Sequence, residues 1–185
     1  MSFASRVVWI TGASSGIGEA LSRALLADGA AVILSGRRVE ALQQLAALAP
    51  ERTLVLPFET TDYERLPELV EQAWAWQGRI DLLINNAGGS CVKGPLHEQS
   101  AQAFRDLLDL NVVSVLLVSS AVMRHAMLKQ KRGHIINISS KAGKVGLPNM
   151  GSYVASKFGH GGTPWHTHRD AISWRTVPNS KAVHS

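Results

Sequence analysis

Five short apolar runs, separated by segments with helical spacing, constrain the fold of this chain most strongly. They are rich in Val, Ile and Leu and occupy residues 6–11, 30–35, 53–58, 80–85 and 134–139. Their apolarity is continuous rather than alternating, which is typical of strands covered on both faces in a parallel sheet. Strands that alternate with helices imply right-handed crossovers. The sequence therefore predicts an α/β fold with a doubly wound parallel sheet.

Apolar residues in the segments between these runs recur at helical spacing. The clearest helix faces are Ile17, Ala20, Leu21, Ala24 and Leu25, then Leu42, Leu45 and Ala46, then Leu66, Leu69, Val70 and Ala73. Gly29, Gly78 and Gly133 fall where predicted helices would end, since glycine adopts the left-handed conformation common after a last helical turn.

Composition limits the classes of protein to which the chain belongs. The length of 185 residues suits one domain, and 45% hydrophobic with 18% charged residues is ordinary for a soluble globular protein. The single cysteine, Cys91, excludes an internal disulfide and indicates a reducing, cytoplasmic compartment. No metal-ligand spacing occurs. The longest apolar stretch, 111–123, is shorter than the ~20 residues that span a bilayer and predicts a buried helix.

The net charge of +5 raises the question of nucleic-acid binding. The basic residues are scattered, apart from those in 128–134, and aromatic residues do not alternate with them. We therefore expect no nucleic-acid partner.

A glycine-rich loop follows the first apolar run. Gly12, Gly16 and Gly18 in "TGASSGIG" (11–18) lie between a predicted strand and a predicted helix. Backbone N–H groups and the dipole at a helix N-terminus favour a pyrophosphate there. The alternative is a tight strand–helix turn that binds no ligand.

This loop and two further motifs resemble those of the short-chain dehydrogenase/reductase family. Residues 11–18 match every position of the family's Thr-Gly-x-x-x-Gly-x-Gly loop, "NNAG" (85–88) matches a second motif, and Tyr153 with Lys157 matches its Tyr-x-x-x-Lys pair. The match covers about residues 5–159. It implies a Rossmann-like dinucleotide-binding domain and hydride transfer between a nicotinamide and a small ketone or secondary alcohol.

The expected cofactor-binding residues are Gly12, Ser14, Gly16, Ile17, Gly18, Arg37, Arg38, Glu59, Asn85, Ala87, Gly88, Tyr153 and Lys157. Arg37 and Arg38 stand at the end of the second strand, where an acidic residue would bind a ribose 2′-hydroxyl. Guanidinium groups suit a 2′-phosphate, so NADP(H) is favoured over NAD(H). The alternative is that both arginines belong to the solvent-exposed start of a helix and bind no ligand. Glu59 stands where the family has an adenine-contacting Asp.

The expected catalytic residues are Asn111, Ser140, Tyr153 and Lys157. Tyr153 and Lys157 are four residues apart and share one face of a helix. A phenol has an unperturbed pKa of ~10, and a nearby ammonium stabilises a phenolate and lowers that pKa. The resemblance implies that Tyr153 is the general acid/base and that Lys157 binds the nicotinamide ribose. It also implies that Ser140, rather than its neighbour Ser139, binds the substrate oxygen, and that Asn111 holds a relay water.

The pattern stops after Gly159. Residues 160–185 contain four of the seven histidines and lack a hydrophobic period, so they predict an irregular tail in which 171–177 is a weak strand candidate. The sheet is then truncated after the fifth strand and the start of the Tyr–Lys helix. We hypothesise a frameshifted tail.

Two functions stay open: an active oxidoreductase, and a truncated or inactive dinucleotide-binding protein. Relatives associate through helices that include the interrupted one, so homo-oligomer formation is also open.

Overall fold

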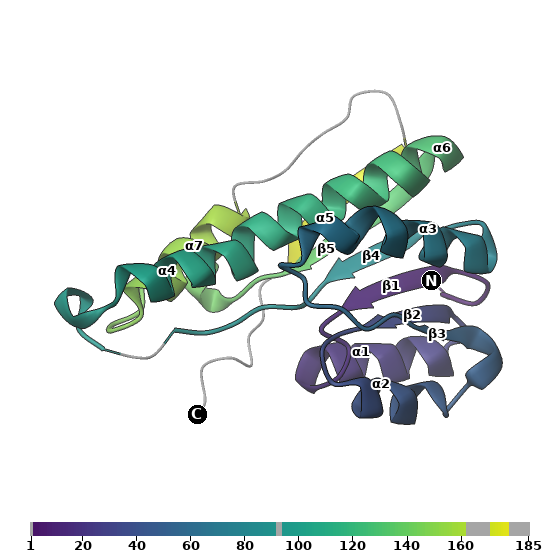
Figure 1. Cartoon of the computed structure of the whole chain (residues 1–185), viewed down its shortest axis with the longest axis horizontal. Helices are drawn as coiled ribbons and strands as arrows, with labels where there is room; N and C mark the ends of the chain where they lie inside the picture. Colours follow the sequence, from purple (N-terminus) through teal and green to yellow (C-terminus); the bar gives the residue numbers. More distant parts are fainter. Residues whose placement is uncertain (1, 92–93, 162–170, 178–185) are drawn as a thin grey trace.

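The structure is a computed structural model that describes residues 2–91, 94–161 and 171–177. These residues form one sheet with helices on both faces (Figure 1). The strands are β1 Val7–Thr11, β2 Ala31–Ser35, β3 Thr53–Val55, β4 Leu82–Asn85, β5 Arg132–Ile138 and β6 Ala171–Val177. The helices are α1 Gly16–Ala27, α2 Val39–Ala46, α3 Leu66–Gln77, α4 Ala101–Leu108, α5 Ser114–Val122, α6 Leu128–Gln130 and α7 Gly151–Gly161.

The strand order is β3-β2-β1-β4-β5-β6, and every pairing is parallel. The chain moves outward from β1 in one direction and then returns to begin β4 on its other side. Ligands bind outside the carboxyl ends of the strands at such a reversal of order. The doubly wound sheet confirms the predicted fold class and places the candidate site beside β1 and β4.

Alternate strand residues enter two separate cores. Val8 and Ile10 of β1 pack under α1 and α2, whereas Val7 and Trp9 pack under α3 and α5. Figure 1 shows these two helix layers on opposite faces of the sheet. Because both faces are covered, the strands are apolar along their whole length, which explains the continuous runs in the sequence.

Residues 101–130 form one long helix in which α4, α5 and α6 are joined by π-helical turns at Asp109–Val113 and Met123–Met127. Its most apolar window has a mean hydropathy of 1.7 and is 39% buried, so its length and composition would allow it to cross a membrane. Val115, Val118 and Val122 are buried in the core beneath it. A core helix of a soluble protein has the same properties, and a single such helix is weak evidence for a membrane segment.

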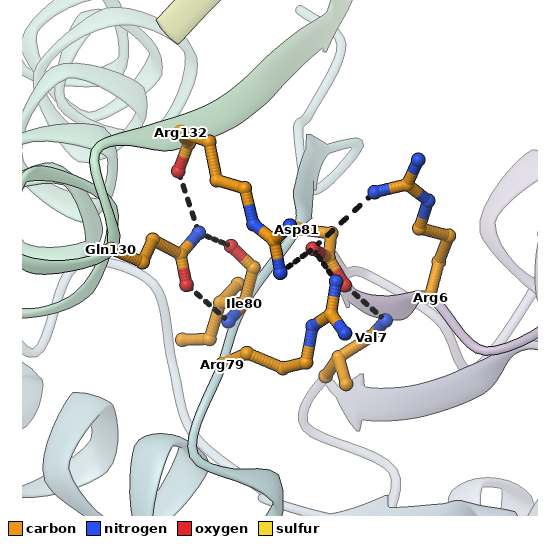
Figure 2. Close-up of polar contacts among 7 residues, drawn as sticks. All are labelled: Arg6, Val7, Arg79, Ile80, Asp81, Gln130 and Arg132. Carbon is orange, nitrogen blue, oxygen red and sulfur yellow. Dashed lines mark hydrogen bonds and ion pairs between the residues drawn. The ribbon is translucent and has the colours of Figure 1, made fainter. Parts of the chain in front are cut away.

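Asp81 joins three strands at the amino end of the sheet (Figure 2). Its Oδ2 accepts a hydrogen bond from Val7 N at 2.9 Å, and its Oδ1 pairs with Arg79, Arg6 and Arg132. Its backbone also bonds β1 and β5, through Val7 O and His134 N. One carboxylate therefore holds β1, β4 and β5 together, at the opposite end from the candidate site.

Two expectations need correction. The sheet does not end at the fifth strand, since β6 pairs in parallel with all seven residues of β5. Residues 171–177 include β-branched and aromatic types that favour strands, and pairing satisfies the backbone groups of the β5 edge. Gly133 also lies inside β5 rather than ending a helix, because Lys131 adopts the left-handed conformation at φ 55° that ends α6.

The helix α7 continues to Gly161, two residues past the predicted boundary. Most of the predicted irregular tail, 162–170 and 178–185, lies outside the described residues. The frameshift hypothesis stays a prediction.

Candidate functional site

The glycine loop connects β1 to α1 and packs against the strand next to it. A Cβ on Gly12 would lie 2.9 Å from Ala87 Cα, and one on Gly18 would overlap the carbonyl oxygen of Gly12. Gly12 and Gly16 have φ of 66° and 55°, which only glycine adopts without strain. The loop therefore requires glycine at positions 12 and 16 for the backbone conformation, and at positions 12 and 18 for close packing.

A cavity of about 460 Å³ opens at the carboxyl ends of β1, β2 and β4. Its lining residues are Gly12, Ser14, Ser15, Gly36, Arg37, Arg38, Phe58, Glu59, Thr60, Asn86, Ala87, Gly88 and Leu110. The predicted residues Gly12, Ser14, Arg37, Arg38, Glu59, Ala87 and Gly88 are thus brought together. Gly16, Ile17 and Gly18 lie in the first turn of α1 beside it.

The two arginines differ in their partners. Arg38 reaches back over the glycine loop, where Nη2 donates to Ser14 O at 2.6 Å and Nε lies 3.4 Å from Ser14 Oγ. Arg37 pairs with Glu59 instead, with Nη1 at 3.4 Å from Glu59 Oε2. The other oxygen of Glu59, Oε1, accepts from Thr60 N at 3.0 Å. Arg37 and Glu59 therefore form an ion pair on the side of the cavity where the neighbouring strands β2 and β3 end.

Three features of this cavity fit a dinucleotide. Ser15 precedes α1 without a side-chain cap, so it leaves the first-turn N–H groups free for an anion. Open space surrounds the Cβ position of Gly16. Thr60 lines the cavity, and its Oγ1 is buried without a hydrogen-bond partner among the described residues. A bound nucleotide would supply the partner that such a buried hydroxyl needs.

The two asparagines of "NNAG" have different surroundings. Asn85 is buried, and its Nδ2 donates to Ser119 Oγ at 2.9 Å and to Asn137 Oδ1 at 2.8 Å, so its side chain joins α5 and β5 rather than lining the cavity. Asn86 lines it, and its Nδ2 donates to the carbonyl oxygens of Thr11 and Gly12, both at 3.1 Å. Asn86 therefore holds the glycine loop, whereas Asn85 braces the sheet.

Asn111 lies fully buried in the π-helical turn between α4 and α5. Its Oδ1 accepts from Gly89 N at 2.9 Å, and its Nδ2 donates to Gly89 O and Ser156 Oγ, both at 3.0 Å. Ser156 Oγ in turn donates to Tyr153 O at 2.8 Å. The Asn111 side chain thereby links the loop after β4 to helix α7.

Tyr63 holds the start of the same π-helical turn. Its hydroxyl donates to Asp109 Oδ1 at 2.7 Å. Burial, together with this hydrogen bond and the Asp109 charge, raises the pKa of Tyr63 above its ordinary value. Tyr63 therefore stays neutral and keeps donating this hydrogen bond.

Ser140, Tyr153 and Lys157 are all buried, with exposed fractions of 2%, 8% and 5%. Ser140 Oγ caps the turn after β5 by accepting from Ala142 N at 3.2 Å, and Ala142 packs against Tyr153. Lys157 Nζ lies 5.8 Å from the centre of the Tyr153 ring. All three predicted residues are thus brought together at the carboxyl end of the sheet.

Lys157 also lies close to Gly88, which lines the first cavity. A Cβ on Gly88 would lie 3.0 Å from Asn111 Oδ1 and 3.5 Å from Lys157 Nζ, so Gly88 lies close to both side chains. Burial lowers the pKa of Lys157 from 10.5 to about 8. Burial therefore disfavours the charged form of this amine, which lies beside the Tyr153 ring.

A second cavity, of about 530 Å³, lies between the loop after β4, α4 and the start of α7. Cys91, Phe104, Leu107 and Ser152 contribute to its lining, which is mostly apolar, and Leu110 is shared with the first cavity. Ser152 directly precedes Tyr153, so this cavity lies next to the buried polar group.

Sequence reasoning did not include Asn86, Thr60 or Ser156 among the site residues. Asn86 belongs to the "NNAG" motif at the carboxyl end of a strand, where α/β sheets bind ligands, and that position is the sequence signal for it. Thr60 adjoins Glu59, but only the structure reveals its unpartnered hydroxyl. Ser156 lies between Tyr153 and Lys157 on the same helix, and no pattern in the sequence indicates its bond to Asn111.

Comparison with known proteins agrees with this arrangement. A family model described as short chain dehydrogenase matches residues 6–171. Cis-4-hydroxycyclohexanecarboxylate dehydrogenase of Sinomonas cyclohexanicum is 38% identical over 85% of this chain and 64% of its own length. Nodulation protein G of Rhizobium sp. (strain N33) is 38% identical over 83% of this chain and 62% of its own length. The chain thus spans less than two thirds of the length of these relatives.

Solved structures share the fold. A short-chain dehydrogenase from Streptomyces avermitilis has a TM-score of 0.87 and 32% identity, over 96% of this chain and 66% of that one. Actinorhodin polyketide ketoreductase with NADPH has a TM-score of 0.87 and 28% identity, over 94% and 69%. A metagenomic short-chain oxidoreductase in complex with NADP has a TM-score of 0.80 and 34% identity, over 88% and 74%.

Proposed function

Because the chain belongs to the short-chain dehydrogenase family, whose members are oxidoreductases, we propose that it is an NADP(H)-dependent oxidoreductase acting on a ketone or secondary alcohol. The observation that carries the proposal is the buried group of Asn111, Ser140, Tyr153 and Lys157 beside the nucleotide cavity. A reducing, cytoplasmic compartment belongs to the same proposal and is supported by the single cysteine.

The choice of NADP(H) rests on charge. Arg37 and Arg38 line the cavity at the end of β2, and an acidic residue that would bind a ribose 2′-hydroxyl is absent from that position. Two guanidinium groups favour the 2′-phosphate that distinguishes NADP(H) from NAD(H). NADP and NADPH are bound in two of the similar solved structures.

In the proposed mechanism each of the four buried polar residues has its own role. A bound nicotinamide cofactor would supply the hydride that is added to a carbonyl carbon of the substrate. The Tyr153 hydroxyl then gives its proton to the carbonyl oxygen, and the Lys157 ammonium stabilises the phenolate that remains. Ser140 Oγ accepts from Ala142 N, which leaves its O–H free to donate to the same carbonyl oxygen. Asn111 holds the loop after β4 against α7 and so positions Lys157.

The experiment that tests this proposal measures NADPH oxidation by the purified 185-residue chain with a panel of small ketones. Tyr153→Phe should lower turnover by ~10²–10⁴-fold, since general acid/base catalysis contributes about that much. Ser140→Ala should also lower turnover, whereas Ser139→Ala is a matched control at the neighbouring position. Nucleotide binding without ketone-dependent oxidation would favour the alternative function, an inactive dinucleotide-binding protein, and would refute the proposal.

A further inference from the structure

Arg37 and Glu59 form an ion pair, and both residues line the nucleotide cavity where β2 and β3 end. The Arg37 side chain is 79% exposed, and its ion-pair partner among the described residues is Glu59. Arg38, by contrast, is already bonded to the backbone and hydroxyl of Ser14. Arg37 is thus the arginine of the pair that is most able to move toward a ligand.

We propose that Glu59 weakens the binding of 2′-phosphorylated nucleotides by pairing with Arg37, so that Glu59 sets the selectivity between NADP(H) and NAD(H). This inference rests on the proposed function and adds a specificity-determining residue to it. The 2′-phosphate and the Glu59 carboxylate compete for one guanidinium group.

One contact and one charge effect favour competition over support. The hydrogen bond from Thr60 N to Glu59 Oε1 keeps the carboxylate on the cavity wall, so it does not simply leave when a phosphate arrives. A phosphate monoester carries about −1.5 to −2 charges at pH 7, and like charges around one guanidinium repel each other. A ligand that takes Arg37 must therefore break the ion pair and approach an anion.

The matched ligands are adenosine 2′,5′-bisphosphate and 5′-AMP, which differ only in the 2′-phosphate. Calorimetric titration of the full chain with each would measure the affinity without any need for turnover. Glu59→Gln should raise the affinity for the bisphosphate by about three- to tenfold and change that for 5′-AMP by less than about twofold. The selective gain should shrink as salt is added, because the groups are exposed.

Two further variants separate charge from contact. Glu59→Asp keeps the charge but shortens the side chain by one methylene, and it should give a smaller gain than Glu59→Gln. Glu51→Gln removes an exposed carboxylate that pairs with Arg52 just before β3, at the opposite end of the sheet, and it should leave both affinities unchanged.

The outcomes separate this inference from the proposed function. An unchanged or weaker bisphosphate affinity in Glu59→Gln, with 5′-AMP still bound, overturns the inference alone, because Glu59 would then support Arg37 rather than compete for it. Failure of every variant to bind either nucleotide overturns both the inference and the nucleotide site. A selective gain supports the inference even if the wild-type chain discriminates poorly.

Discussion

Lys157→Met should make the ligand-free protein more stable, although it removes a residue of the proposed active site. Lys157 is 5% exposed and its pKa is lowered from 10.5 to about 8 by burial. Methionine keeps the unbranched apolar part of the side chain and removes the charge. We expect the free energy of unfolding to rise at pH 7 and turnover to fall.

The magnitude follows from the pKa. One pKa unit corresponds to ~1.4 kcal/mol, so lowering the pKa from 10.5 to about 8 costs the folded state ~3 kcal/mol when the amine is protonated. Loss of the contact with the Tyr153 ring, ~0.5–1 kcal/mol, offsets part of the gain. The net expectation at pH 7 is a stabilisation of ~2–3 kcal/mol.

The sign of the pH dependence is also determined. Between pH 8 and 10.5 the unfolded chain binds more protons at Lys157 than the folded chain, so the stability of the wild type rises with pH in that window. The cost of burial is fully present below the folded pKa and is lost above the unfolded one. The difference between Lys157→Met and wild type should therefore shrink toward zero, or become slightly negative, near pH 10.5.

Urea unfolding followed by tryptophan fluorescence at pH 7 and pH 10 would measure both quantities. Lys144→Met, at an exposed lysine nearby, is the control and should change stability little at either pH. The reasoning is refuted if Lys157→Met is no more stable than wild type at pH 7, or if the gain is the same at both pH values.

Three more substitutions test other parts of the structure. Gly18→Ala should lower 5′-AMP affinity at least about tenfold in calorimetry, because its Cβ would overlap the Gly12 carbonyl oxygen and displace the loop. Asp81→Asn should lower the free energy of unfolding in urea by ~1–3 kcal/mol, because a buried acceptor loses its charge among three arginines. Ser156→Ala should lower it by ~1–2 kcal/mol, because a fully buried hydroxyl loses one donor and one acceptor contact.

Each of these has an outcome that contradicts it. Gly146→Ala, where open space surrounds the new methyl group, should leave affinity unchanged, and an equal loss in both glycine variants would argue against a loop-specific effect. Full stability of Asp81→Asn would mean that its ion pairs contribute nothing to the sheet. Ser156→Ala with unchanged stability would mean that water replaces the hydroxyl.

The apolar pattern of the sequence correctly predicted the helix α1, but the predicted buried face differs from the observed one. The expected face included Ala20 and Ala24, which are exposed, whereas Gly18 and Ser22 are buried. Apolar periodicity does not detect a face made of small residues. α1 packs closely on the glycine loop at these positions, and Ser22 Oγ satisfies its own hydrogen bond by donating to Gly18 O at 2.7 Å.

The motifs of the candidate site were easier to predict than its contacts. The spacing of Tyr153 and Lys157 on one helix follows from local geometry, and the structure brings Ser140 to them because β5 ends at the same edge of the sheet. The inward direction of Asn85 and the ion pair of Glu59 depend on residues far away in the sequence. Such contacts follow from the packed sheet and from side-chain length, which no local pattern encodes.

The π-helical turn at Asp109–Val113 amounts to one extra residue wound into a continuous helix. Each residue of a regular helix advances the face by about 100°, so the extra residue lets α4 and α5 keep separate packing faces while Asn111 turns inward. The inward position of Asn111 therefore depends on one extra residue in this helix. Insertion of one residue into a regular α-helix creates such a π-helical turn. Deletion of one residue from this turn would remove it and leave a continuous α-helix.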